Sequence, residues 1–192
     1  MNFSSPPAVA AWLHQQARTG FEVAGVQSVN DGWVLSGCTS AVEECEAWVV
    51  DYQIEVAADW TTRSARVTRR VGAVGRGATI EGDGRGRWRV DGVRRDDLDG
   101  CLDIDLESSA LTNAFPVHRL ALEPRQSAEA PAAYIRTSLA VERLEQTYTR
   151  VDSQEPHQRF RYRAPVFGFE CELLYDASGF ALSYPGIAVR TL

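Results

Sequence analysis

The sequence contains no lysine, so all 20 of its basic residues are arginine. Arginine must then fill every basic role, and an arginine cluster is weaker evidence of phosphate recognition than usual. The net charge of −6 argues against a general nucleic-acid binder. The charge is uneven, because residues 63–95 hold ten arginines and three acidic residues, a balance of +7, and the remainder therefore sums to −13. We expect no nucleic-acid partner.

Long apolar runs are also missing. No stretch approaches the ~18 residues that a transmembrane helix needs, so we expect no transmembrane segment. The N-terminus, MNFSSPPAVAAWLHQQARTG, has neither a basic start nor the apolar core of roughly 7–15 residues that a signal peptide carries. The expected location is therefore cytoplasmic.

The cysteines lack metal-ligand spacing. Cys38, Cys45, Cys101 and Cys171 form no CxxC pair, and the three histidines do not cluster with them. A zinc site is not expected on this spacing, and thiols stay reduced in the cytoplasm. We predict four free thiols, no metal site and no cofactor.

Strand-like alternation of apolar and polar residues is what the sequence does contain. Residues that tolerate turns, such as Asn30-Asp31-Gly32 and Asp91-Gly92, separate short strands at intervals of roughly 8–14 residues. We therefore predict an all-β fold, in which one mostly antiparallel sheet of many strands is rolled or barrel-like. The alternating stretches are WVVDYQIEV (48–56), CLDIDLE (101–107), RFRYR (159–163) and FGFECELLY (167–175).

A short helix is expected before the sheet. Ser5 can cap it, Pro7 fits its first turn and Gly20 can end it. We predict a helical extension over residues 1–20 and a single β domain over residues 21–192. The interior of a curled sheet is either packed solid or holds an apolar ligand.

An acidic ladder lies on one predicted strand, where Asp103, Asp105 and Glu107 point the same way. Such carboxylates can act as a general acid and base or hold a divalent cation. They can equally form a solvated sheet face, paired with arginines of the next strand. His118 is the histidine in the most unusual setting and is therefore the candidate base. If the protein is an enzyme, either a hydrolase or an isomerase, it would use Asp103, Asp105 and His118.

The stretch ALTNAFPVHRL (110–120) is unusual for a strand. Asn113 tolerates a bend and Pro116 removes a backbone donor, so we expect a turn or bulge over residues 108–116 and a strand over residues 117–122. His118 and Arg119 would then lie on opposite faces of that strand. An arginine that faces the interior must be paired. We therefore predict a buried ion pair between Arg119 and Asp103 or Asp105.

The arginine-rich segment 63–95 includes GRGRWRV. Interleaved arginine, glycine and tryptophan can clamp a nucleic acid or an anionic head group. The alternative is a solvated hairpin in a protein that uses arginine throughout.

Several stretches, in order, resemble the bacterial putative glycolipid-binding family. WVVDYQIEVAADWTTRSARV and GRGRWRVDG are similar to the family's tyrosine-rich strand, W-x-[ST]-R element and G-x-W hairpin, and DGCLDIDLESSALTNAFPVHRL, LEQTYTRV and LLYDASGFALSYPGIAVR continue the likeness to Leu192. His118 replaces the first arginine of the family pattern T-N-x-[LF]-P-[IV]-R-R-L, so one of two adjacent positive charges depends on pH. The matching residues are Asp103, Asp105, Thr112, Asn113, Pro116, Arg119, Leu120, Tyr148, Gly179, Tyr184, Pro185 and Gly186.

The resemblance implies a rolled or barrel-like sheet, likened to bacterial lipoprotein-carrier barrels, that binds an amphipathic small molecule such as a glycolipid. Apolar strand faces would take the acyl or ring portion, and the arginines of residues 63–70 would help to meet the head. The alternatives are the enzyme above and a protein-interaction module with a solid core. The candidate ligand-binding residues are Thr112, Asn113, Arg119, His118, Asp103, Asp105, Trp60, Arg63, Tyr148 and Tyr184.

Two structural features would separate these functions. An internal cavity above about 300 Å³ would favour binding or catalysis over the interaction module. Convergence of Asp103 or Asp105 with His118 inside that cavity would favour the enzyme.

Overall fold

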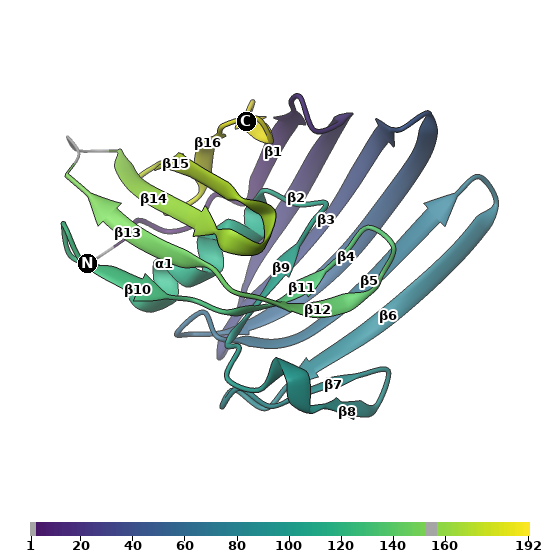
Figure 1. Cartoon of the computed structure of the whole chain (residues 1–192), viewed down its shortest axis with the longest axis horizontal. Helices are drawn as coiled ribbons and strands as arrows, with labels where there is room; N and C mark the ends of the chain where they lie inside the picture. Colours follow the sequence, from purple (N-terminus) through teal and green to yellow (C-terminus); the bar gives the residue numbers. More distant parts are fainter. Residues whose placement is uncertain (1–2, 153–156) are drawn as a thin grey trace.

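A computed structural model describes residues 3–152 and 157–192. The N-terminal part of the chain forms consecutive antiparallel strands (Figure 1). These are β1 (Val9–His14), β2 (Thr19–Val29), β3 (Gly32–Glu43), β4 (Glu46–Ala57), β5 (Thr62–Val71), β6 (Val74–Gly82), β7 (Trp88–Val90) and β8 (Val93–Arg95).

The C-terminal part extends the same sheet from its other side. Its strands are β10 (Ser127–Glu129), β13 (Thr147–Val151), β14 (Gln158–Ala164), β15 (Phe169–Tyr175), β16 (Ala181–Tyr184) and β17 (Ala188–Arg190). The 14-stranded sheet has the order β10-β13-β14-β15-β16-β17-β1-β2-β3-β4-β5-β6-β7-β8. The predicted all-β, mostly antiparallel single domain is confirmed.

The middle of the chain fills the hollow side of this sheet (Figure 1). Strands β9 (Asp103–Leu106), β11 (Ala132–Ile135) and β12 (Val141–Leu144) form a small sheet in which β9 and β11 are parallel. The helical elements are η1 (Asp96–Leu98), η2 (Leu111–Asn113), α1 (Ala114–Leu120) and η3 (Pro165–Phe167). None of the helices in the described ranges is long and apolar enough to cross a membrane.

The helix predicted over residues 1–20 is wrong, because residues 9–14 form strand β1. Ala10, Trp12 and His14 are buried and Val9 and Leu13 are exposed, so the residues alternate with period two except at Ala11, which is also buried. β1 pairs with β2 on one side and with β17 on the other, so it joins the two parts of the sheet. An isolated helix of this length has marginal stability. As a strand, the same backbone groups form hydrogen bonds with neighbouring strands on both sides.

The strand predicted over residues 117–122 is also wrong, because ALTNAFPVHRL is helical. Pro116 lies in the first turn of α1, where its missing N–H needs no partner. Ala121 adopts a left-handed conformation, with φ of 44°, and its N–H donates to the carbonyl of Val117. The left-handed conformation of Ala121 ends the helix at Leu120, so His118 and Arg119 lie in its last turn.

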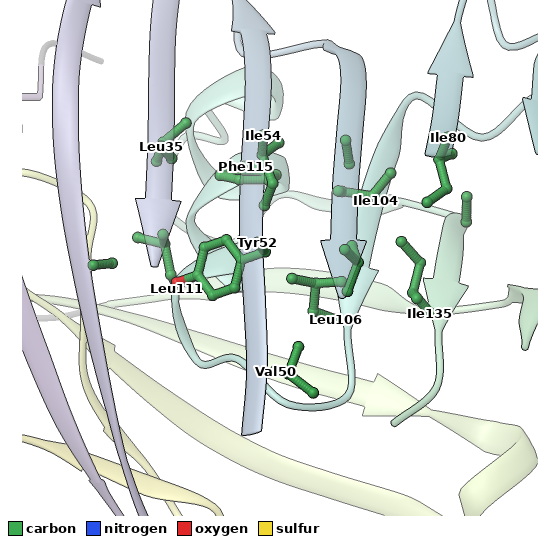
Figure 2. Close-up of a cluster of buried hydrophobic side chains, with 14 of the residues drawn as sticks. Leu35, Val50, Tyr52, Ile54, Ile80, Ile104, Leu106, Leu111, Phe115 and Ile135 are labelled. Carbon is green, nitrogen blue, oxygen red and sulfur yellow. The ribbon is translucent and has the colours of Figure 1, made fainter. Parts of the chain in front are cut away.

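The hollow of the sheet is packed with side chains rather than open. Figure 2 shows Leu35, Tyr52 and Ile54 of the large sheet against Leu106 of β9 and Phe115 of α1. The alternation predicted for β4 is confirmed, since Trp48, Val50, Tyr52, Ile54 and Val56 are all buried. The strand faces expected to take an acyl chain therefore contact the protein's own middle segment.

The predicted free thiols are confirmed for all four cysteines. Cys101 is buried, and burial raises the pKa of its thiol to about 11. Cys45 is exposed.

Candidate functional site

A pocket of about 330 Å³ lies where the middle segment meets the C-terminal strands. Polar residues reach it from the turn before β2, the end of β9 and η2, and aromatic residues reach it from β11, β14 and β16. We call it the tyrosine pocket. The lining residues that matter most are Arg18, Asp105, Asn113, Tyr134, Tyr162 and Tyr184.

Asp105 is the buried carboxyl group of this pocket. Its Oδ1 accepts a hydrogen bond of 2.8 Å from the Thr112 hydroxyl, which in turn accepts one from the N–H of Leu106. Burial raises the pKa of Asp105 to about 6, and the negative charges of Asp103 and Glu107 act in the same direction. The carboxyl group therefore gains a proton slightly below neutral pH.

Asn113 is held from behind by two tyrosines. Its side-chain oxygen accepts a 2.9 Å hydrogen bond from the Tyr148 hydroxyl, and its backbone carbonyl accepts one of 3.2 Å from the Tyr175 hydroxyl. Because the amide oxygen is already bonded, the amide nitrogen is the group that Asn113 offers to a ligand.

An aromatic wall faces these polar groups. The rings of Tyr162, Tyr184 and Phe169 pack together, with centroids 5.9–6.2 Å apart. Burial raises the pKa of Tyr162 and of Tyr184, so both hydroxyls are neutral at ordinary pH. The wall combines ring faces with hydroxyl groups and is therefore amphipathic.

Arg18 completes the pocket, and sequence reasoning missed it because the residue was assigned to a helix that does not exist. Its side chain is only 6% exposed. The guanidinium group lies over the Trp48 ring, and its Nη2 is 3.8 Å from a carboxylate oxygen of Glu43. Its Nε and Nη1 are buried without a hydrogen-bond partner among the described residues.

Glu22 is a second buried charge that sequence reasoning missed. Its carboxylate accepts hydrogen bonds from the Tyr52 hydroxyl at 2.7 Å, the N–H of Ala110 at 2.7 Å and the Ser109 hydroxyl. Burial raises the pKa of Glu22, while these hydrogen bonds oppose the rise. Gly37 leaves room for the Tyr52 ring, since a Cβ there would lie 2.3 Å from it. Glu22 thus ties β2 to the start of η2.

A second pocket, of about 420 Å³, contains His118 and is called the His118 pocket. The His118 ring stacks on the Trp60 ring, with their centroids 3.8 Å apart, and the Phe3 ring packs against His118 with a centroid distance of 4.2 Å. Burial lowers the pKa of His118 to about 4, so the ring is neutral at ordinary pH. Gly179, with φ of +75°, is required here because a Cβ would lie 2.6 Å from Nε2 of His118.

The predicted ion pair of Arg119 is confirmed, with Asp103 as its partner. Nε and Nη2 of Arg119 donate to the two carboxylate oxygens of Asp103 at 2.9 and 2.6 Å. Asp103 is fully buried, whereas Arg119 is half-buried and lines the His118 pocket. Asp103 and Asp105 of the acidic ladder are therefore buried, and they do not form a solvated sheet face.

The structure divides nine of the ten candidate residues between the two pockets and leaves Arg63 outside both. Asp105, Asn113 and Tyr184 line the tyrosine pocket, with Thr112 and Tyr148 bonded behind them. Trp60, His118 and Arg119 line the His118 pocket, with Asp103 behind them. Asp105 and His118 thus line different pockets. Asp103 is not part of the lining of the His118 pocket, and both of its oxygens bond to Arg119, so the convergence of Asp103 or Asp105 with His118 that would favour the enzyme is not observed. Within the described ranges, no three His, Cys, Asp or Glu side chains are placed to hold a metal ion.

Arg63 and its neighbours stand apart from both pockets. Arg63 is exposed on β5, Arg69 pairs with Glu46 and Arg70 pairs with Asp51 at 2.8 Å. These contacts fit the solvated hairpin and do not place residues 63–70 around a head group.

The fold and the tyrosine pocket define a curved, barrel-like β protein with a pocket of buried polar and aromatic residues. A family model described as "Putative glycolipid-binding" matches residues 9–190, so the chain belongs to this family. The structure is similar to the crystal structure of a DUF1089 family protein from Pseudomonas aeruginosa. The identity is 29%, the TM-score is 0.78, and the match covers 100% of this chain and 96% of the other.

A beta-barrel-like protein with a domain of unknown function, DUF1849, from Brucella abortus is similar in fold alone. Its identity is 12%, its TM-score is 0.54, and the match covers 98% of this chain and 96% of the other. No curated protein matches the chain.

Proposed function

We propose that the protein binds the polar head of an amphipathic small molecule, of the glycolipid class, in the tyrosine pocket. The observation that carries this proposal is the pocket itself, where a buried carboxyl group and a held amide face a wall of tyrosines. Ligand sites combine apolar and aromatic walls with a few fixed polar groups, as this pocket does. Sugar hydroxyls can bond to Asp105 and Asn113, while the ring lies against the aromatic side chains.

The size of the pocket limits what it holds. Its volume of about 330 Å³ is at the small end of the range of roughly 300–1,000 Å³ for ligand sites. A head group fits this space, whereas a whole diacyl lipid does not. The acyl portion therefore stays at the mouth of the pocket, since the hollow of the sheet is filled by the middle segment. A cytoplasmic location remains a prediction from the sequence.

A pair of blocking variants tests the site. Ala17 lines the tyrosine pocket and Ala58 lines the His118 pocket, and both are exposed, so a tryptophan at either position need not disturb the core. Octyl glucoside, titrated below its micelle concentration in a calorimeter, serves as the ligand. We expect binding to wild type and to Ala58→Trp, and a loss of at least about tenfold in Ala17→Trp, because the indole fills the space of the sugar.

Two results would contradict the proposal. One is the absence of binding to wild type by octyl glucoside and by its charged analogue octyl glucuronide. The other is equal binding by wild type and Ala17→Trp together with a loss in Ala58→Trp, which would move the site to the His118 pocket.

A further inference from the structure

We infer that the ligand of the tyrosine pocket carries an anionic group, and that Arg18 recognises it. This inference rests on the proposed function, because it names the charge of the head group that the pocket would hold. The ligand chemistry is an oxyanion on a sugar-sized head, such as a carboxylate, phosphate or sulfate. Such a group is the natural partner of a guanidinium group.

The electrostatic environment of Arg18 is incomplete. A buried charge is stable only when it is paired and hydrogen-bonded. Among the residues that the structure describes, its one ion-pair contact is with Glu43 at 3.8 Å, which is too long for a hydrogen bond. Nε and Nη1 have no partner among the described residues, and the Trp48 ring supplies only a cation–π contact.

Arg136 also lines the tyrosine pocket, and nearby acidic side chains neutralise its charge. Its guanidinium group lies 2.6 Å from Glu142 and 3.7 Å from Glu107, and it also packs over the rings of Tyr134 and Phe167. The positive charge of Arg136 is therefore used within the protein. Arg18 is the pocket arginine whose charge still lacks a close counterion.

The acidic residues of the pocket do not cancel this charge. Glu107 accepts hydrogen bonds from the N–H and hydroxyl groups of Thr137 and faces Arg136. Glu43 is partly exposed to solvent. Asp105 is bonded to Thr112, and when protonated it can donate a hydrogen bond to an anion rather than repel it. An oxyanion beside Arg18 would thus supply the missing counterion.

The test compares octyl glucuronide with octyl glucoside by calorimetry on the full chain. Wild type is expected to bind the glucuronide more tightly. Arg18→Gln is expected to lose about 10- to 100-fold of glucuronide affinity and less than about threefold of glucoside affinity, since hydrogen bonds to charged groups contribute most to anion binding. Removing a poorly paired buried charge costs little stability, so the Tm of Arg18→Gln should stay at or above that of wild type.

Arg150 provides the matched control. Counted over the whole residue, side chain and backbone together, Arg150 and Arg18 are both 9% exposed, and the Nε of Arg150 also lacks a partner among the described residues. Arg150 lies on β13, outside the lining of the tyrosine pocket. Arg150→Gln should leave the affinities for both octyl glycosides within about twofold of wild type. A glucuronide loss in Arg150→Gln as large as that in Arg18→Gln would overturn the inference.

Two further outcomes separate the inference from the proposed function. If both glycosides bind wild type and Arg18→Gln equally, the anionic head is excluded while sugar binding stands. If free glucuronate or inorganic phosphate binds as tightly as octyl glucuronide and depends on Arg18, the anion site is supported and the amphipathic part of the proposed function fails.

Discussion

The two pockets differ in what their polar groups bond to. In the His118 pocket, Arg119 is engaged by both oxygens of Asp103. The His118 ring is neutral and enclosed by Trp60 and Phe3, and its Nε2 lacks a partner among the described residues, so the unpartnered group there carries no charge. In the tyrosine pocket, Arg18 has unpartnered nitrogens among the described residues, and Asp105 has one oxygen bonded to Thr112. The first arrangement satisfies its own charges within the protein, whereas the second leaves a charge that, in our proposal, a ligand completes.

Among these variants, Arg119→Ala is expected to have the largest effect on stability. The variant leaves the carboxylate of Asp103 buried without its partner, so the free energy of unfolding should fall by about 3–5 kcal/mol. Urea denaturation followed by tryptophan fluorescence measures this loss. Arg63→Ala, at an exposed position, is the control and should stay within about 0.5 kcal/mol of wild type. A loss of less than about 1 kcal/mol in Arg119→Ala would show that the pair has no structural role.

Asp105→Asn is expected to change how stability depends on pH. The pKa of Asp105 is raised from 3.8 to about 6, so the folded state binds this proton more tightly than the unfolded state does. Its contribution to stability is therefore fully present below about pH 4 and is lost as the pH rises to about 6, a change of about 3 kcal/mol.

Urea titrations of wild type and Asp105→Asn between pH 4 and pH 7 test this dependence. Burial also raises the pKa of Glu22 and of Asp103, so both proteins should lose stability as the pH rises. The difference between their free energies of unfolding isolates the contribution of Asp105. We expect this difference to shift in favour of the variant as the pH rises to about 6, because wild type loses the contribution and the variant does not. Parallel curves would place the carboxyl group of Asp105 in contact with water.

The smallest expected effect concerns the hydrogen bond behind Asn113. Tyr148→Phe removes the hydroxyl that donates to the amide oxygen, which should lower the free energy of unfolding by about 0.5–1.5 kcal/mol. The affinity for octyl glucoside should also fall, because the amide is no longer held in place. Affinity and stability that both match wild type would mean that the amide is positioned by other contacts.

The sequence predicted strands such as β4 and β14 well because apolar and polar residues alternate along them. The burial of Tyr52 and Ile54 on β4 follows directly from their spacing. The Arg119–Asp103 pair was also predictable, because a buried guanidinium needs a carboxylate nearby.

The helical conformation of ALTNAFPVHRL was not predictable from local pattern. Glu22 accepts a hydrogen bond from Ala110 at the start of this segment although it lies 88 residues earlier in the chain. The strand β1 depends in the same way on its pairing with β17 at the far end of the chain. Arg18 follows β1, so the error in that element also concealed the arginine of the site.

Crystals grown with octyl glucuronide would test the central claim most directly. The account predicts a sugar ring against Tyr162 and Tyr184, with the carboxylate of the ligand beside Arg18 and the alkyl chain leaving through the mouth of the tyrosine pocket. Ligand density beside Trp60 and His118, with the tyrosine pocket empty, would contradict it.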